Sequence, residues 1–557
     1  MENAQVAAIF EEIADLLELQ EGNQFRIRSY RNASRAVADL SERVEDRVKS
    51  GDDLTKLPNV GKSTAGKIKE IIETGTCQRL DDLRKEVSTE LIDLLHVPNL
   101  GPRKAKQIHD ALDVNSLEDL KQACENQQVR DLPGMGAKTE ENILKGIRIA
   151  ESATGRTLLK EAADMVDALG KHLDGIDAVR EWYVAGSYRR CKETIGDLDF
   201  LILADDRGSV ADQITRHKTI QDVIGRGSEK VSVRLEGGLQ VDFRFVDKNA
   251  LGAALLYFTG SKQHNIALRQ RAVQRDWKLN EYGLFKGDTR LAGATEEAVF
   301  ERFNMDWIPP EMRENRGEIE AAEKHALPTL VTRDDIRGDM HCHTDATDGS
   351  NTIEDMAAAA RDMGYDYLAL CDHSKAVRVA GGLDDNAMKK HAARIREVDE
   401  SMDDFRLLTG VEVDILKDGK LDLEEDTLAD LDWVTASTHY HFNLNEQEMT
   451  DRLLAAVRSG VVHCLGHPFA RQIGRREPVA FDVAKVFEAC AENNVCLEIN
   501  SQPERLDLLD IYCKRARDLG VKIVVVTDAH STADLAFIRF GIGIARRGWL
   551  RKEDIVN

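Results

Sequence analysis

Three aspartates lie in two short apolar segments of the chain at a spacing that suits divalent cations. Asp197 and Asp199 alternate with apolar residues in the first segment, and Asp242 lies in a second segment of the same character. Strand side chains alternate between the two faces of a sheet, so Asp197 and Asp199 share a face. If the two strands pair, the three carboxylates form a site for two Mg²⁺ ions that clamp a phosphoryl group during in-line displacement. An isolated Asp-x-Asp is more often a solvated strand edge or a turn.

A glycine-serine turn just before the acidic pair favours the metal-site interpretation. Residues 186–190 read GSYRR, and the backbone N–H groups of such a turn, together with the Ser187 hydroxyl, can hold a triphosphate. The combination resembles the nucleotidyltransferase superfamily. It predicts a reaction but leaves the substrate open.

The C-terminal part of the chain contains a second set of potential metal ligands. From residue 337 onward, strand-like and helix-like segments alternate, and histidines or acids follow the apolar strands. One such histidine is more often a core or surface residue, but nine positions in this pattern predict ligands that converge on the mouth of a barrel. Mixed imidazole and carboxylate ligands suit Mn²⁺, Zn²⁺ or Fe, which would generate hydroxide for phosphoester hydrolysis. The nine are His341, His343, Asp348, His373, Glu412, His439, His467, Asp528 and His530.

The N-terminal part contains three related short turns of the form Pro-x-x-Gly. The three copies lie at residues 57–61, 97–101 and 132–136, and a segment containing Lys or Arg follows each. They are of the helix-hairpin-helix kind, in which backbone N–H groups at a helix N-terminus meet a DNA phosphate, so binding would tolerate any sequence. One copy alone is more often a plain turn between helices; three favour DNA. The glycines expected at the phosphate are Gly61, Gly101, Gly134 and Gly136.

Length and composition set the wider limits. With 557 residues, the chain should form three or four domains. It has no run of about 18 apolar residues and no signal-type N-terminus, which predicts an intracellular protein outside the membrane. A net charge of −23 argues against nucleic acid, yet bound metals and backbone amides can replace a basic surface. Nine cysteines without a C-x-x-C pair predict buried, reduced thiols.

A family resemblance emerges when the polymerase-like motifs are read in order. GSYRR, GDLD at 196–199, VDFR at 241–244 and YFTGS at 257–261, with Asn265 after them, resemble a family X DNA polymerase, the group typified by DNA polymerase beta. The match covers about the first 316 residues. It implies that Asp197, Asp199 and Asp242 bind two Mg²⁺ ions, with Asp242 nearest the primer 3′-hydroxyl.

The same resemblance implies roles at the nucleotide and at the gap. Lys67 matches the family's Schiff-base lysine for removing a 5′-deoxyribose phosphate. A solvated lysine is an equal alternative, because a lysine nucleophile needs a lowered pKa. In addition, Ser63 stands where the animal enzyme has a companion lysine. Gln240 replaces an arginine. The nucleotide would contact Gly186, Ser187 and Arg190 at its phosphates, Tyr257, Phe258 and Gly260 beside its sugar, and Asn265 and Arg269 on the minor-groove side of the new pair.

The C-terminal motifs resemble the PHP phosphoesterase domain, a distorted β/α barrel with a trinuclear metal centre. All nine of its ligand positions are filled, which implies an active site. The two halves together resemble bacterial and archaeal family X polymerases. This implies gap filling in base excision repair with dNTPs on gapped or primer-template DNA, and a Mn²⁺-dependent 3′–5′ exonuclease. A 3′-phosphatase or abasic-site endonuclease activity is a further option for the barrel.

The expected fold is therefore multidomain, α+β and α/β: helical hairpin domains, a nucleotidyltransferase palm with a mixed or antiparallel sheet, and the barrel. We expect a cytoplasmic, nucleoid-associated monomer. The alternatives are a phosphatase of small phosphoesters with a DNA-binding N-terminal half, and, less favoured, a non-catalytic scaffold for DNA ends. The expected boundaries are 1–86 (lyase-like), 87–153 (second hairpin subdomain), 154–248 (palm), 249–316 (nucleotide-selecting subdomain), 317–336 (linker) and 337–557 (barrel).

Overall fold

The computed structural model describes residues 3–20, 23–38, 40, 44–57, 60–86, 94, 97, 100–152, 156–474 and 476–557. The chain forms two compact units, Met1–Arg156 and Thr157–Asn557. No helix among the described residues combines the length and the apolar character of a membrane span. All nine cysteines are free thiols, and eight of them are buried, as the sequence predicts.

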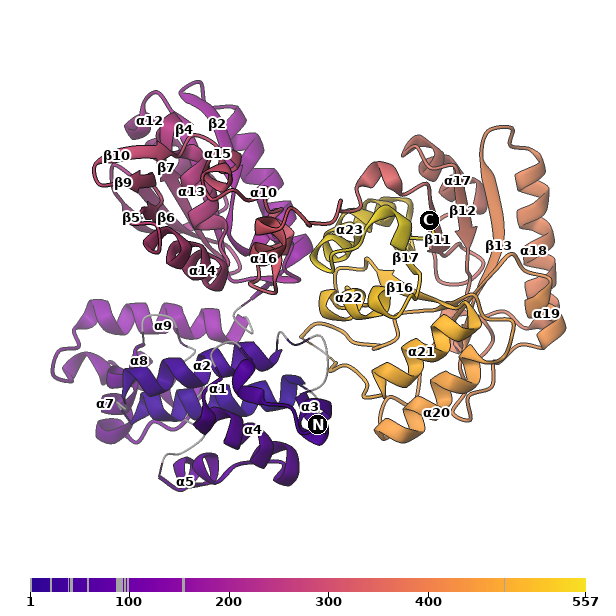
Figure 1. Ribbon diagram of the computed structural model, residues 1–557, viewed down its shortest axis with the longest axis horizontal. Coiled ribbons are helices and arrows are strands. Elements are labelled where there is room, and N and C mark those ends of the chain that lie inside the picture. The colour runs from indigo at the N-terminus through magenta and orange to yellow at the C-terminus, as the bar shows by residue number, and fades with distance from the viewer. Residues whose placement is uncertain are drawn as a thin grey trace. The chain divides into compact units, whose positions relative to one another are not determined.

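The first unit is helical (Figure 1). It has two hydrophobic cores. One core includes Phe10 and Ile13 of the first helix, whose apolar residues recur at helical spacing. The other surrounds Ile108 and Ile143. The helices are α1 (Asn3–Leu19), α2 (Gln24–Ala38), α3 (Val44–Lys49), α4 (Lys62–Thr74), α5 (Gln78–Glu86), α7 (Pro102–Leu112), α8 (Leu117–Glu125) and α9 (Ala137–Ser152).

The second unit begins with a five-stranded mixed sheet in the order β2-β4-β7-β6-β5. Only the pair β4–β7 is parallel. Helices α10 (Leu159–Asp174) and α12 (Arg207–Ile214) pack on the face that carries Leu198 and Phe200. The opposite face, which carries Leu201 and the aspartates, meets α13 (Leu251–Thr259). The strands are β2 (Val179–Val184), β4 (Asp197–Ala204), β5 (Ile220–Arg226), β6 (Lys230–Leu235) and β7 (Gln240–Phe245).

A smaller subdomain follows the sheet. Helices α13 and α14 (Lys262–Val273) lead into a three-stranded antiparallel sheet and α15 (Glu296–Arg302). The connector to the barrel contains the short helix α16 (Glu318–Glu323). The strands of the small sheet are β8 (Lys278–Asn280), β9 (Gly283–Lys286) and β10 (Thr289–Ala292).

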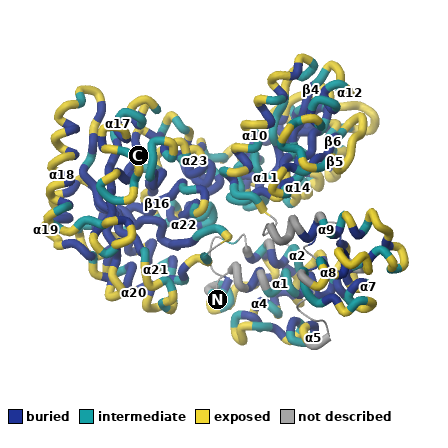
Figure 2. The backbone as a smooth tube through the Cα atoms, turned by 180° about the vertical axis from the view of Figure 1, so that it is seen from behind, coloured by how far each residue is buried: buried dark blue, intermediate teal, exposed yellow. Residues whose placement is uncertain are grey.

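The C-terminal domain is a seven-stranded parallel barrel in sequential strand order. A parallel bridge between Cys342 and Ala529 brings its first and last strands together. Figure 2 shows β16 buried, whereas the outer turns of α18 (Asp385–Glu400) and α20 (Glu446–Val457) are exposed. The strands are β11 (Gly338–Cys342), β12 (Tyr367–Leu370), β13 (Arg406–Asp414), β14 (Trp433–Ser437), β15 (Cys464–Leu465), β16 (Cys496–Asn500) and β17 (Ile523–Val526); the remaining helices are α17 (Ile353–Asp362), α19 (Glu425–Ala429), α21 (Val483–Asn493), α22 (Asp510–Asp518) and α23 (Ile538–Arg547).

Candidate active sites

The acidic residues of the palm lie on adjacent parallel strands. In the register of β4 and β7, Asp199 lies opposite Asp242 and Asp197 lies opposite Gln240. The predicted pairing of the two strands is therefore present. Asp242 is buried, Asp199 is partly buried and Asp197 is exposed, so the trio leads from the interior of the sheet to solvent.

The electrostatics of the trio fit a divalent cation. Burial and the neighbouring charge of Asp197 raise the pKa of Asp199 to about 6. Burial also tends to raise the pKa of Asp242, but hydrogen bonds from Lys230, Ser232 and Gln240 outweigh it and lower that pKa. The side of the trio at Asp197 and Asp199 thus carries negative charge that Lys230 does not contact, and an ion there would neutralise it.

Two basic side chains bind the two inner acids, Asp199 and Asp242. Lys230 Nζ lies 2.6 Å from Asp242 Oδ2. Arg244 donates to Asp242 Oδ2 at 2.8 Å and to Asp199 Oδ1 at 3.3 Å, and its guanidinium lies 4.3 Å from the Phe258 ring centroid. Sequence reasoning missed both. Arg244 could have been found from the sequence, because it lies two residues after Asp242 in the same strand and therefore points to the same face of the sheet.

The predicted phosphate-binding turn lies directly over the acids. Gly186 opens the short helix α11 (Gly186–Arg189), which includes Ser187. Its φ is +65°, and a Cβ there would lie 3.1 Å from Asp199 Oδ2, so the turn requires glycine. Arg190 donates to Glu314 Oε1 at 3.1 Å and to the carbonyl of Thr259. A Cβ at Gly260 would lie 3.3 Å from Arg190 Nη1. Gly260 and Arg190, which are both predicted to contact the nucleotide, are therefore neighbours.

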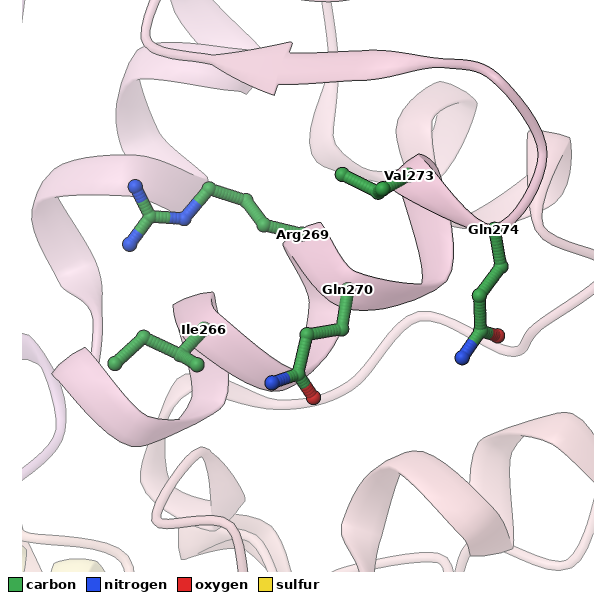
Figure 3. A pocket seen from close by; sticks show the side chains of 5 residues that line it. All are labelled: Ile266, Arg269, Gln270, Val273 and Gln274. Atoms are coloured by element: carbon green, nitrogen blue, oxygen red, sulfur yellow. The ribbon is translucent and has the colours of Figure 1, made fainter.

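The predicted nucleotide-selecting residues also gather on neighbouring helices. Tyr257 and Phe258, at the end of α13, meet edge to face with centroids 5.0 Å apart. Asn265 on α14 donates to the carbonyl of Tyr257 at 2.6 Å, and Arg269 donates to the carbonyl of Asn265 at 3.2 Å. The same helix borders an open hollow of about 450 Å³ (Figure 3), lined by Ile266, Arg269, Gln270, Val273 and Gln274.

The barrel brings its nine predicted ligands together at the carboxyl ends of its strands. Among the described residues, three clusters have ligand atoms within 4.8 Å of one another, and all three lie here. His341 and Glu412 lie within β11 and β13, slightly earlier than predicted, and the others follow strand ends. The clusters are His343, Asp348, His373 and His530; His341, His343 and Asp528; and His373, Glu412 and His439.

Glu412 links the clusters at the centre of the barrel. Its carboxylate lies 2.9 Å from His467 Nε2, 2.9 Å from His373 Nδ1 and 3.2 Å from His439 Nε2. Asp528 Oδ1 lies 3.0 Å from His343 Nε2. The ninth residue, His467, therefore joins the set through Glu412.

Charge and hydrogen bonding show that this site suits cations. The buried atoms His341 Nε2, His343 Nδ1 and His467 Nδ1 have no hydrogen-bond partner. Burial lowers the pKa of His373, but Glu412 and Asp348 outweigh it and raise that pKa to about 10. The acids thus attract positive charge that metal ions would supply, while the free imidazole nitrogens offer lone pairs.

A second layer of acids orients the histidines, and sequence reasoning missed it. Glu498 Oε2 lies 2.7 Å from His341 Nδ1, and Asp414 Oδ1 lies 3.1 Å from His439 Nδ1. Such partners fix the ring orientation of a metal ligand. Glu498 could also have been found, because it is an acidic residue in β16, the one barrel strand for which the sequence predicts no ligand. The structure shows it buried.

The predicted DNA-contacting residues of the first unit lie at helix starts. Gly61 and Gly101 are the N-caps of α4 and α7, while Gly134, with φ +76°, and Gly136 precede α9. Residues 58, 59, 98 and 99 of the first two turns lie outside the described part of the chain. Lys67 on α4 lies 3.0 Å from Ser63 Oγ and 5.8 Å from the Tyr30 ring centroid.

Comparisons with known proteins match every part of this architecture. Family models match as a helix-hairpin-helix domain (residues 1–77), a SAM-like helix-hairpin-helix tandem (91–148), a DNA polymerase beta palm (157–244) and thumb (254–314), and a PHP domain (339–502). A Bacillus subtilis protein named DNA polymerase/3′-5′ exonuclease PolX is 36% identical over 100% of this chain and 97% of its own.

Two other relatives each match part of the chain. A Photobacterium profundum protein named probable phosphatase is 30% identical over 35% of this chain and 79% of its own. DNA polymerase lambda of Arabidopsis thaliana is 25% identical over 56% of this chain and 62% of its own. The chain is thus similar both to a protein named a probable phosphatase and to a protein named a DNA polymerase.

Proposed function

This chain belongs to the family X DNA polymerases that carry a C-terminal PHP domain, and we propose that it fills short gaps in DNA during base excision repair. It is a DNA polymerase with a 3′–5′ exonuclease. The observation that carries the proposal is the parallel register of Asp199 and Asp242, with the Gly186 turn packed against Asp199. A phosphatase of small phosphoesters is not favoured, because the Bacillus subtilis relative matches both halves of the chain.

In the polymerase reaction, we assign each step to residues of the palm and thumb. Asp197, Asp199 and Asp242 would hold two Mg²⁺ ions, which stabilise charge on the attacking and leaving oxygens when bound. Asp242 is proposed to lie nearest the primer 3′-hydroxyl, with Lys230 and Arg244 fixing its orientation. The incoming dNTP is held by Gly186, Ser187 and Arg190 at its phosphates, by Tyr257, Phe258 and Gly260 beside its sugar, and by Asn265 and Arg269 at the base pair.

In the nuclease reaction, the nine barrel ligands would hold up to three Mn²⁺, Zn²⁺ or Fe ions. Metal ions in such a site supply a hydroxide near neutral pH and bind the phosphate oxygens. Glu498 and Asp414 keep His341 and His439 in ligand orientation. We propose 3′–5′ hydrolysis of DNA as the main activity of the barrel, with 3′-phosphatase and abasic-site endonuclease activities on the same site.

DNA binding is proposed to rest on backbone amides, since the chain has a net charge of −23. The amides at Gly61, Gly101, Gly134 and Gly136 would meet phosphates of any sequence. Lys67 would contact the 5′ side of the gap, as a lyase nucleophile or as a cation beside phosphate. We propose a cytoplasmic monomer associated with the nucleoid. The domain boundaries that we propose are those given above: 1–86, 87–153, 154–248, 249–316, 317–336 and 337–557.

One assay on gapped duplex DNA with a labelled primer tests the function. We expect extension with Mg²⁺ and dNTPs, and 3′–5′ shortening with Mn²⁺ and no dNTPs. Asp242→Asn should reduce extension at least about a hundredfold and spare shortening, whereas His341→Ala should do the reverse. If either substitution removed both activities from a folded protein, the division into two sites would be wrong.

A further inference from the structure

The C-terminal barrel domain packs against the phosphate-binding turn of the polymerase site. The segment that follows this turn, residues 190–193, meets the barrel domain at three points. Gly543 of α23 approaches it so closely that a Cβ there would lie 2.9 Å from Cys191 Cβ. Arg471, after β15, donates to Glu193 Oε2 at 2.7 Å. Arg547, at the end of α23, donates to the carbonyl of Arg190 at 2.7 Å.

Arg547 also shares an acidic partner with the Arg190 side chain. Its Nη1 lies 2.9 Å from Glu314 Oε1, the atom that accepts from Arg190 Nε at 3.1 Å. Its Nη2 lies 2.6 Å from Asp510 Oδ2. The Arg547 side chain is only 2% exposed, so these ionic hydrogen bonds are shielded from water and the orientation of each group is fixed.

The surrounding contacts show a continuous interface. Arg316 lies 3.1 Å from Asp510 Oδ2, and Arg546 lies 2.6 Å from Glu311 Oε1. Trp549, two residues beyond α23, is part of the hydrophobic cluster that contains Ile308 and Met312 of the polymerase half. These contacts join the barrel domain to the polymerase half, and α23 makes two of the three contacts with residues 190–193.

We propose that Arg547 and Arg471 are positioning residues for nucleotide addition, through which the nuclease domain holds the Arg190 turn ready for the triphosphate. This rests on the proposed polymerase function. Arg547 shares the Glu314 carboxylate with Arg190, and the positive charges of Lys192 and Arg316 also act on that carboxylate. Without Arg547, Glu314 loses the strongest of these cationic neighbours, holds Arg190 more tightly and competes with the triphosphate for it. The nuclease domain thereby supports synthesis as well as degradation.

Steady-state extension of gapped DNA by the full chain tests this. We expect Arg547→Met to raise KM for dNTP about tenfold with kcat within twofold of wild type, as expected when one charged hydrogen bond is lost. Arg547→Met combined with Glu314→Gln should restore most of the KM, because the competing charge is removed. A purely structural role for Arg547 would give no such rescue. Arg396→Met, which breaks a pair with Asp430 inside the barrel domain, is the matched control.

The outcomes separate this inference from the proposed function. If wild type fails to extend gapped DNA, the proposed function is wrong. If wild type extends DNA but Arg547→Met leaves KM unchanged, or raises it without rescue by Glu314→Gln, the inference is wrong. Should Arg547→Met fail to fold, as judged by lost exonuclease activity, Glu193→Gln decides. It breaks the Arg471 contact from the palm side, and a raised KM supports the inference whereas an unchanged KM overturns it.

Discussion

Asp199 carries a carboxylate whose ionised form is destabilised by the fold. Its pKa rises from 3.8 to about 6 because of burial and the charge of Asp197. The unfolded chain therefore ionises at lower pH than the folded one, and stability falls as the pH rises from about 4 to about 6. At 1.36 kcal/mol per pKa unit, the penalty above pH 6 is on the order of 1–3 kcal/mol in the absence of metal.

Replacing that carboxylate should consequently stabilise the metal-free protein while destroying synthesis. We expect Asp199→Asn to raise the free energy of unfolding by about 1–2 kcal/mol at pH 8 in EDTA, less the lost contact with Arg244, and to have no effect near pH 4. Urea titrations at both pH values measure this. Mg²⁺ should stabilise wild type and leave the variant unchanged. Asp177→Asn, at an exposed position of the same domain, is the control; an equal gain there, or a loss for Asp199→Asn at pH 8, would contradict the argument.

At the scale of elements, the sequence predicts those features of a strand or helix that depend on its own residues alone. Alternation in the two segments around Asp199 and Asp242 predicts two strands with aspartates on one face, and the structure has both strands in parallel register. The partners of these acids depend on a third strand, because β6 pairs with β7 and places Ser232 opposite Asp242, two residues from Lys230. Which strand lies beside another in the sheet is set by tertiary packing, and the pattern of residues within one strand does not predict it.

The same limit applies to the barrel and to the interface. Each ligand lies in or just after a recognisable strand, whereas Glu498 acquires its role only when β16 packs beside the other strands of the barrel. Arg547 meets Arg190 across 357 residues of sequence. A buried arginine near the end of a helix carries no local sign of such a partner.

Helix α13, which positions Tyr257 and Phe258, depends on a close approach at its first turn. A Cβ on Gly252 would lie 2.0 Å from the Thr295 carbonyl carbon. We expect Gly252→Ala to destabilise the protein by about 1–3 kcal/mol through overpacking, and to slow extension by displacing the helix. Gly66→Ala is the opposite case, because that exposed position in α4 has no atom within 4 Å. It should gain about 0.5–1 kcal/mol from helix propensity.

Thermal unfolding of both glycine variants, with primer extension by each, checks the pair. The melting temperature should fall for Gly252→Ala and rise for Gly66→Ala, so a general effect of adding a methyl group cannot explain both changes. Equal melting temperatures for Gly252→Ala and wild type would show that Thr295 moves aside at no cost.

At the scale of the whole molecule, one chain carries a site that extends a 3′ end and a site that removes one. The chain is acidic, with a net charge of −23, so repeated dissociation and recapture of DNA is opposed by long-range repulsion. Keeping both sites on one chain avoids that step. A 3′ end that cannot be extended reaches the second site at the effective concentration set by the covalent connection, rather than at the bulk protein concentration.

A mixing experiment measures the advantage of having the polymerase site and the nuclease site on one chain. Asp242→Asn retains the nuclease site and His341→Ala retains the polymerase site. On gapped DNA with a mismatched 3′ end, wild type should remove the mismatch and then extend the primer within one binding event, even when excess unlabelled DNA is added as a trap. An equimolar mixture of the two variants should complete the reaction without the trap, because each can rebind, and fail with it. The intramolecular step is worth at least about tenfold in rate if the effective concentration is near the millimolar range expected for linked domains. Equal completion by wild type and mixture in the presence of the trap would show that the two sites act as separate enzymes that share a chain.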